Sequence, residues 1–141
     1  MSSDLKKIES FLQKHHVLSL ATSSDNEPSV CSLFYTFSKE KNSFIVASSD
    51  ETLHIDNIKQ NKNIAGNILL ETKLIGKIQG VQFRGEFLLL EDSALKKLYF
   101  KAFPHAIFMK PKLWQIKVNY FKMTDNTLGF GKKIIWMDSS L

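Results

Sequence analysis

Two spacings of apolar residues alternate along the chain and predict its elements. Apolar residues three and four positions apart predict helices, whereas alternation of apolar and polar residues predicts half-buried strands. The helical spacing predicts three short helices, at residues 5–12, 51–61 and 92–103. The remaining apolar runs predict strands at residues 17–22, 29–37, 43–48, 63–70, 78–90, 113–124 and 134–137. A polar segment, residues 23–28, is expected to form the first turn.

The two longest predicted strands carry the clearest patterns. In residues 78–90, one face holds polar side chains and the other is apolar, formed by Val81, Phe83, Phe87 and Leu89. Gly85 falls on the apolar side, which predicts a bend or a close approach of another backbone. In residues 113–124 the apolar positions change parity after Tyr120, which predicts a β-bulge there.

The connections between these elements decide the fold class. They are short, and no long crossover links parallel strands, so a Rossmann-type sheet is not expected. Six to seven antiparallel strands with about three short helices predict a mainly β fold with flanking α, namely a barrel. A chain of 141 residues fits one domain, residues 1–141.

Composition narrows the location and the partners. No apolar run reaches the roughly 20 residues of a membrane span, and the first residues lack a signal-peptide core. We therefore expect a cytoplasmic protein without a membrane partner. The net charge is +5, but Arg84 is the only arginine and the lysines are scattered. This distribution argues against specific nucleic-acid recognition.

Cysteine and histidine give little sign of metal chemistry. Cys31 is the only cysteine, which excludes an internal disulfide and a cysteine-based zinc cluster. It lies in an apolar run, so we interpret it as a structural thiol, while a nucleophilic role would need a nearby base. His15 and His16 end the first predicted helix, where they complement its dipole. No metal site is predicted.

The junction at residues 44–54 carries the main candidate chemistry. An apolar strand ends in Ser48 and Ser49, and Thr52 and His54 follow at a predicted helix start. Ser48 and Glu51 have the spacing of a capping box, and Ser49 or Asp50 would also serve as the N-cap. Alternatively, hydroxyl groups and a helix amino end would together bind a phosphate.

Three segments resemble a known superfamily. They are the strand–turn–strand–helix unit at 28–63, GVQFRGE at 80–86 and TDNTLGFGKKIIW at 124–136. Together they resemble the pyridoxamine 5′-phosphate oxidase-like, FMN-binding split-barrel superfamily, and the last two are similar to a small subfamily of it. The resemblance implies a split barrel, and a homodimer with FMN at the subunit interface.

The resemblance also implies roles for individual residues. Ser48, Thr52 and His54 would hold the FMN phosphate, and one strand would follow the isoalloxazine ring with Cys31, Ser32, Leu33 and Phe34. Ser49 is a further candidate from its own position at the predicted helix start. Gln79 and Gln82 lie near a position that gives the ring a polar contact. Trp114 matches an aromatic residue that the second protomer contributes.

Two departures from the superfamily pattern concern charge. Val30 and Leu53 stand where many members carry arginine or lysine, so the phosphate would lack charge-assisted contacts. Lys132 and Lys133 are the candidate substitutes. Their segment, residues 124–133, has two interpretations, which are a structural corner and a basic loop that reaches the partner's ligand.

The function expected from this sequence is that of an FMN-dependent oxidoreductase with an unknown small substrate. The flavin would supply the redox chemistry, and the sequence identifies no catalytic side chain. The alternative is a non-catalytic module that holds flavin or haem. Oxidation of pyridoxamine phosphate itself is not expected, because the C-terminus IIWMDSSL lacks the arginine-containing motif of those oxidases.

Overall fold

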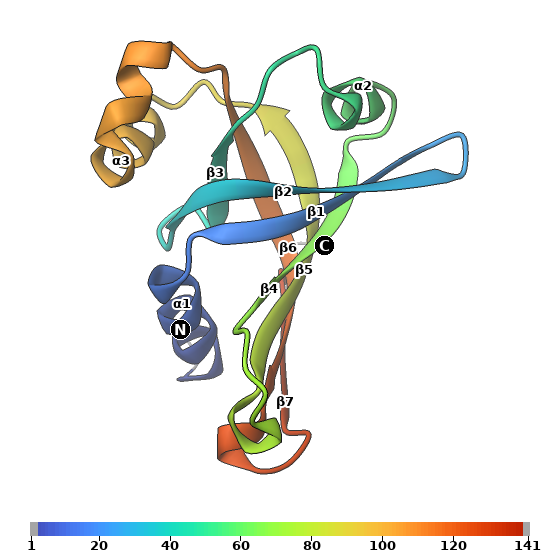
Figure 1. Cartoon of the computed structure of the whole chain (residues 1–141), viewed down its shortest axis with the longest axis vertical. Helices are drawn as coiled ribbons and strands as arrows, with labels where there is room; N and C mark the ends of the chain where they lie inside the picture. Colours follow the sequence, from blue (N-terminus) through green and yellow to red (C-terminus); the bar gives the residue numbers. More distant parts are fainter. Residues whose placement is uncertain (1–2, 140–141) are drawn as a thin grey trace.

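The computed structural model describes residues 3–139 and contains one seven-stranded antiparallel sheet (Figure 1). The strand order is β3-β2-β1-β4-β5-β6-β7, and an additional pairing of β3 with β6 closes most of the sheet into a barrel. The strands are β1 (Val17–Ser24), β2 (Glu27–Ser38), β3 (Ser43–Ala47), β4 (Asn63–Leu69), β5 (Gln79–Leu89), β6 (Leu113–Asp125) and β7 (Lys133–Met137). The predicted mainly β split barrel is confirmed.

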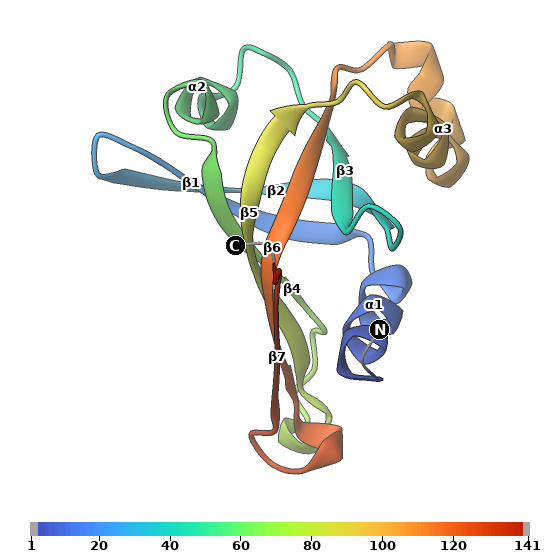
Figure 2. The same ribbon diagram turned by 180° about the vertical axis from the view of Figure 1, so that it is seen from behind.

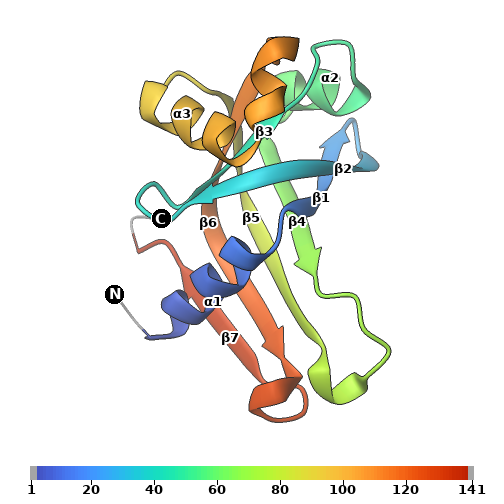
Figure 3. The same ribbon diagram turned by 60° about the vertical axis from the view of Figure 1, so that its left-hand side comes forward.

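Three α-helices flank the barrel, as predicted. They are α1 (Ser3–Lys14), α2 (Leu53–Gln60) and α3 (Ser93–Ala102), and three 3-10 turns accompany them, η1 (Ile75–Lys77), η2 (Pro104–Met109) and η3 (Asn126–Leu128). Helices α2 and α3 lie at one end of the molecule, whereas the β6–β7 connection forms the other end (Figures 1 and 2). Helix α1 packs against β2 and β7, and runs across the strands in Figure 3.

Aromatic rings fill the barrel. Phe44 is fully buried and contacts four other rings at centroid distances of 4.7–6.3 Å, those of Tyr35, Phe37, Phe83 and Phe121. Helix α1 adds Ile8 and Leu12 to this core. A smaller cluster, which includes Ile45, Leu95 and Tyr99, holds α3 against β3. Burial of this aromatic and aliphatic surface is the main stabilising contribution.

The β-bulge predicted near Tyr120 and the close backbone approach predicted at Gly85 are the same feature of the β5–β6 pair. Arg84 pairs with Tyr120, but Gly85 pairs with Val118, so Asn119 is the extra residue of β6. Both Val118 and Phe121 therefore face the core. A Cβ at position 85 would collide with the carbonyl oxygen of Lys117, which explains why glycine occupies the site.

Two local predictions are wrong. Residues 23–28 do not form a long turn, because the strands continue to Ser24 and Glu27 around a two-residue turn. Its residues, Asp25 and Asn26, have φ angles of 52° and 64°, which match the twist of a tight hairpin. Leu89 does not share the buried face of β5, since its side chain is 49% exposed at the strand end.

Candidate functional site

The barrel is split beside β2. Strand β3 pairs with β2 only from Tyr35 to Ser38, although β2 begins at Glu27. On its other side, residues 27–34 pair with β1 along their whole length. Among the described strands, none therefore pairs with the β3 side of this part of β2. A strand edge of this kind presents backbone N–H and C=O groups that a ligand or another chain can bind.

Strand β3 leaves the sheet at this split and leads to α2 through Ser48–Thr52. The Ser48 hydroxyl bonds to Nε2 of His54, and the Thr52 hydroxyl lies 3.2 Å from the same nitrogen. Thr52 also donates its hydroxyl hydrogen to the Ser49 carbonyl oxygen at 3.0 Å. Three of the predicted phosphate residues, Ser48, Thr52 and His54, thus meet in one cluster, which we name the hydroxyl corner.

The capping interpretation of this segment is wrong. Helix α2 begins at Leu53, and its N-cap residue is Thr52 rather than Ser48, Ser49 or Asp50. The Thr52 side chain makes no cap hydrogen bond, so no N-cap side chain satisfies the first N–H groups of α2. Ser49 is exposed, and its hydroxyl accepts a hydrogen bond from the Glu51 N–H at 3.3 Å. The first N–H groups of α2 therefore remain available as hydrogen-bond donors at the positive end of the helix dipole.

Burial sets the ionisation of the hydroxyl corner. His54 is half-buried, and desolvation lowers the pKa of its imidazole from the usual 6.5. The ring is therefore neutral at neutral pH. A phosphate beside Nε2 would favour the protonated ring, because an adjacent negative charge stabilises the imidazolium.

Lys112 supplies a cation that the sequence patterns did not single out. Its Nζ contacts both carboxylate oxygens of Asp50, at 2.8 and 2.9 Å, and its carbonyl accepts the Ser48 N–H at 3.0 Å. Both side chains line a hollow of about 510 Å³ formed by residues 47–51 and 109–112. Lys112 lies 64 positions after Ser48, so only the β3–β6 pairing brings the two together.

Trp114 is a core residue in this chain. Its ring is 5% exposed and packs on Phe87, and its indole N–H donates to the Ser48 carbonyl at 3.0 Å. This burial contradicts the expectation that Trp114 extends to a ligand held by a second protomer. Its role is to hold the strand end that carries Ser48.

The four predicted ring-contacting residues of β2 alternate between two faces. Cys31 and Leu33 pack against the core, while Ser32 and Phe34 point outward. Burial raises the pKa of the Cys31 thiol, which supports its interpretation as a structural residue. Phe34 is 58% exposed, and its ring stacks on His16 at 5.9 Å. Of these four residues, only Ser32 and Phe34 therefore present exposed side chains beside the open strand edge.

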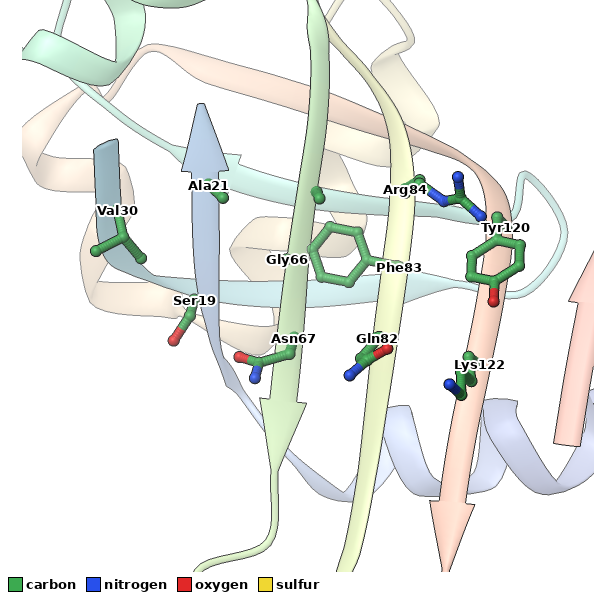
Figure 4. A pocket seen from close by; sticks show the side chains of 11 residues that line it. Ser19, Ala21, Val30, Gly66, Asn67, Gln82, Phe83, Arg84, Tyr120 and Lys122 are labelled. Carbon is green, nitrogen blue, oxygen red and sulfur yellow. The ribbon is translucent and has the colours of Figure 1, made fainter. Parts of the chain in front are cut away.

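The outward face of the sheet continues from β2 across to β6 (Figure 4). Strand register aligns its side chains in two parallel rows. The first row is Val30, Ala21, Ala65, Arg84 and Tyr120. The second row is Ser32, Ser19, Asn67, Gln82 and Lys122. All of them except Ser32 line a hollow of about 650 Å³, which we name the sheet groove. Two predicted residues, Ser32 and Gln82, thus share one row.

Two other predicted site residues, Lys132 and Gln79, lie at the opposite end of β6 from Ser48. Ser48 is hydrogen-bonded to the start of β6, whereas Lys132 bonds to its last residue, Asp125. The 13-residue strand between them is about 40 Å long at roughly 3.3 Å per residue. Lys132 therefore does not compensate a phosphate at Ser48 of its own chain. Gln79 also lies at this end, where its amide donates to Asp125 Oδ2 at 3.1 Å.

The donor set fits an anion better than a metal. The hydroxyl corner offers two hydroxyls, an imidazole and the amino end of α2, which are groups that bind phosphate. Asp50 and Glu51 lie beside it, but Lys112 offsets the charge of Asp50. Residues 3–139 contain no cluster of three histidine, cysteine or carboxylate side chains placed to hold a metal ion. No helix in that range is long and apolar enough to cross a membrane.

Comparison with known proteins identifies the family. The family model of pyridoxamine 5′-phosphate oxidase matches residues 5–122, which is most of the chain. The chain belongs to the pyridoxamine 5′-phosphate oxidase family. It is 37% identical to a UPF0306 protein of Photorhabdus laumondii over 132 residues, 92% of either chain. It is 35% identical to the UPF0306 protein YhbP of Escherichia fergusonii, covering 96% of this chain and 95% of YhbP.

Solved structures of low sequence identity share the fold. A haem-binding protein of Mycobacterium smegmatis superposes with a TM-score of 0.79 at 15% identity, over 97% of this chain and 59% of that longer one. An FAD-binding protein of Mesorhizobium loti gives 0.72 at 15% identity, over 87% and 92% of the two chains. The haem storage protein HutZ of Vibrio cholerae gives 0.64 at 16% identity, over 80% and 88%.

Proposed function

We propose that this family member binds FMN and acts as a flavin-dependent oxidoreductase on a small molecule. The observation that supports this proposal most is that the Ser48 and Thr52 hydroxyls both contact His54 at the amino end of α2. These groups would bind the FMN phosphate, and Lys112, which is paired with Asp50 beside this corner, would supply a cation. The FAD-binding structural neighbour supports a flavin as the ligand.

The proposed position of the flavin ring is the unpaired edge of β2. Backbone groups of residues 31–34 would bind the polar edge of the ring, and the exposed Phe34 would cover part of its apolar surface. The bound flavin would supply the hydride chemistry, while the protein orients the ring and excludes water. A second copy of the chain would complete the site as a homodimer, since a single chain leaves this edge open.

The test compares FMN with riboflavin, which has the same ring but no phosphate. Purified full-length protein is titrated with each ligand, and quenching of flavin fluorescence gives the affinities. The double variant Thr52→Val, His54→Ala should bind FMN at least about tenfold more weakly, the effect of losing one charge-assisted contact. Its riboflavin affinity should stay the same.

A matched control keeps this result specific. His105→Ala removes an exposed histidine of η2 and should leave FMN binding unchanged. If wild-type protein binds FMN no better than riboflavin, the phosphate assignment is wrong. Oxidoreductase activity is tested separately, because NADH or NADPH should bleach the absorbance of the bound flavin. Bound flavin that neither donor reduces would reject the enzyme and leave only a carrier.

The second candidate is a haem-binding module. Two structural neighbours are a haem-binding protein and a haem storage protein. In this chain the exposed His16 ring is parallel to the ring of Phe34, at an interplanar angle of 5° and a centroid distance of 5.9 Å, on the β1 side of β2. A histidine on an exposed aromatic surface is a suitable axial ligand for haem. Haemin should then give a Soret band that His16→Ala removes and His105→Ala retains.

A further inference from the structure

Another hollow lies between α1 and the turn that joins β2 to β3 (Figure 3). Its volume is about 630 Å³, and we name it the helix hollow. Its charged and polar lining residues include Lys6, Glu9, Gln13 and Lys14 of α1, with Lys39 and Glu40 of the turn. No residue that lines it belongs to the hydroxyl corner or to the sheet groove. The helix hollow is therefore separate from the site proposed for FMN.

Glu9 is a buried carboxylate without a partner. It is 4% exposed, and it forms no hydrogen bond or ion pair with any other residue in the described range 3–139. Burial raises the pKa of its carboxyl group, an effect that outweighs the opposing positive charges of Lys39 and Lys6. Buried carboxylates ordinarily have a hydrogen-bond donor or a cation beside them. Because Glu9 lines the helix hollow, a ligand bound there can supply that donor.

The packing of α1 fixes Glu9 in this place. Ile8 and Leu12 anchor the helix in the barrel core, and the Gln13 side-chain amide donates to the Phe37 carbonyl at 3.1 Å. A rotation of the helix that brought the Glu9 carboxylate into water would remove Ile8 and Leu12 from the core. The carboxylate is therefore held at the border between the core and the hollow.

Lysines surround the mouth of the helix hollow. Lys6, Lys14 and Lys39 are exposed, and none of them forms an ion pair within the described part of the chain. A simple amine would meet repulsion from these lysines, whereas a ligand with a negative group at its other end would be attracted by them. The aliphatic stems of the lysines offer apolar contact to the part of the ligand between its two charges.

We propose that the helix hollow binds a small aliphatic amino carboxylate. Its ammonium group donates hydrogen bonds to Glu9, and its carboxylate lies among the lysines at the mouth. The amide oxygen of Gln13 is a further acceptor for the ammonium group. The inference does not depend on FMN binding, because the two sites share no residue.

The test uses three probes with the same six-carbon chain. 6-Aminohexanoate carries both charges, hexylamine carries only the ammonium group, and hexanoate carries only the carboxylate. Each is titrated into isotope-labelled full-length protein, and the NMR shifts of backbone amides report both affinity and position. 6-Aminohexanoate should bind at least about tenfold more tightly than either other probe, because only this compound interacts with both charges. The amides that shift should be those of residues 6–14 and 39–40.

Two variants with matched controls test the two ends of the ligand. Glu9→Gln keeps the size of the side chain and should weaken 6-aminohexanoate binding about tenfold or more without weakening hexanoate binding. Its control, Glu91→Gln, removes an exposed carboxylate outside the hollow and should change nothing. Lys39→Gln should weaken 6-aminohexanoate binding by about two- to threefold, since exposed charges contribute less. Lys7→Gln, on the same helix as Glu9 but outside the hollow, should leave it unchanged.

Four outcomes would overturn the proposal. They are hexylamine binding as tight as that of 6-aminohexanoate, a Glu9→Gln variant that binds like wild type, amide shifts away from the helix hollow, and no binding of any probe. Circular dichroism checks the fold of Glu9→Gln, which should persist because the change removes a buried charge without changing size. Saturating FMN should not displace 6-aminohexanoate, and displacement would also contradict a separate site. A protein that fails to bind FMN can still pass every one of these tests.

Discussion

At the residue scale, His54 links the ionisation of the hydroxyl corner to the stability of the fold. Burial lowers its pKa below the 6.5 of an unfolded chain, so the unfolded state binds more protons at mildly acidic pH. Stability should therefore be complete above pH 6.5 and fall as the pH drops toward the folded pKa. Urea unfolding between pH 8 and pH 5 should show this loss, and His54→Gln should reduce it. Equal slopes for both proteins would contradict the assignment.

Gly85 offers a second prediction at this scale. Any side chain there meets the Lys117 backbone across the β6 bulge, which cannot retreat without losing strand pairing. Gly85→Ala should therefore destabilise the fold by about 3 kcal/mol, at the upper end for overpacking. Urea unfolding measures this change. Gly76→Ala is the matched control, because a Cβ at that position meets no atom within 4 Å.

At the element scale, α3 depends on its cap more than α2 does. Asp92 accepts hydrogen bonds from the N–H groups of Ala94 and Leu95, at 2.8 and 3.2 Å, and so begins the helix. Asp92→Ala should reduce stability by about 1 kcal/mol, or roughly 3 °C in Tm, whereas Asp92→Ser should retain most of it. Differential scanning calorimetry would measure both. Identical losses would show that the cap is not responsible.

The sequence predicted a helix, strand or bulge correctly where the pattern of apolar residues within one short segment determines it. The β6 bulge followed from the change of parity after Tyr120, and α3 followed from its helical spacing before Pro104. The hairpin at Asp25 was missed, because polar residues in a tight turn resemble those of a loose one. The two side-chain rows of the sheet groove could not be predicted from the sequence, because they depend on the register of five strands. Lys112 was missed for the same reason.

At the scale of the whole molecule, the sequence did not indicate which end of the barrel holds which segment. The hydroxyl corner lies at the amino end of α2, whereas Lys132 belongs to the β6–β7 connection. Helix α2 and this connection lie at opposite ends of the molecule (Figure 2). The expectation that Lys132 serves the phosphate therefore applies only between two chains. In a homodimer, Lys132→Ala would weaken FMN binding while leaving the fold of each chain intact.

Ligand binding should couple the site to the stability of the whole chain. If FMN binds only the folded protein, a concentration 100 times its Kd stabilises that state by about 2.7 kcal/mol. Thermal unfolding should therefore shift upward with FMN at such a concentration, and the shift should grow with the logarithm of its concentration. In the Thr52→Val, His54→Ala variant the same FMN concentration should give a smaller shift, because its Kd is larger. If FMN leaves the Tm of the wild-type protein unchanged while haemin raises it, haem binding would replace flavin binding as the preferred function.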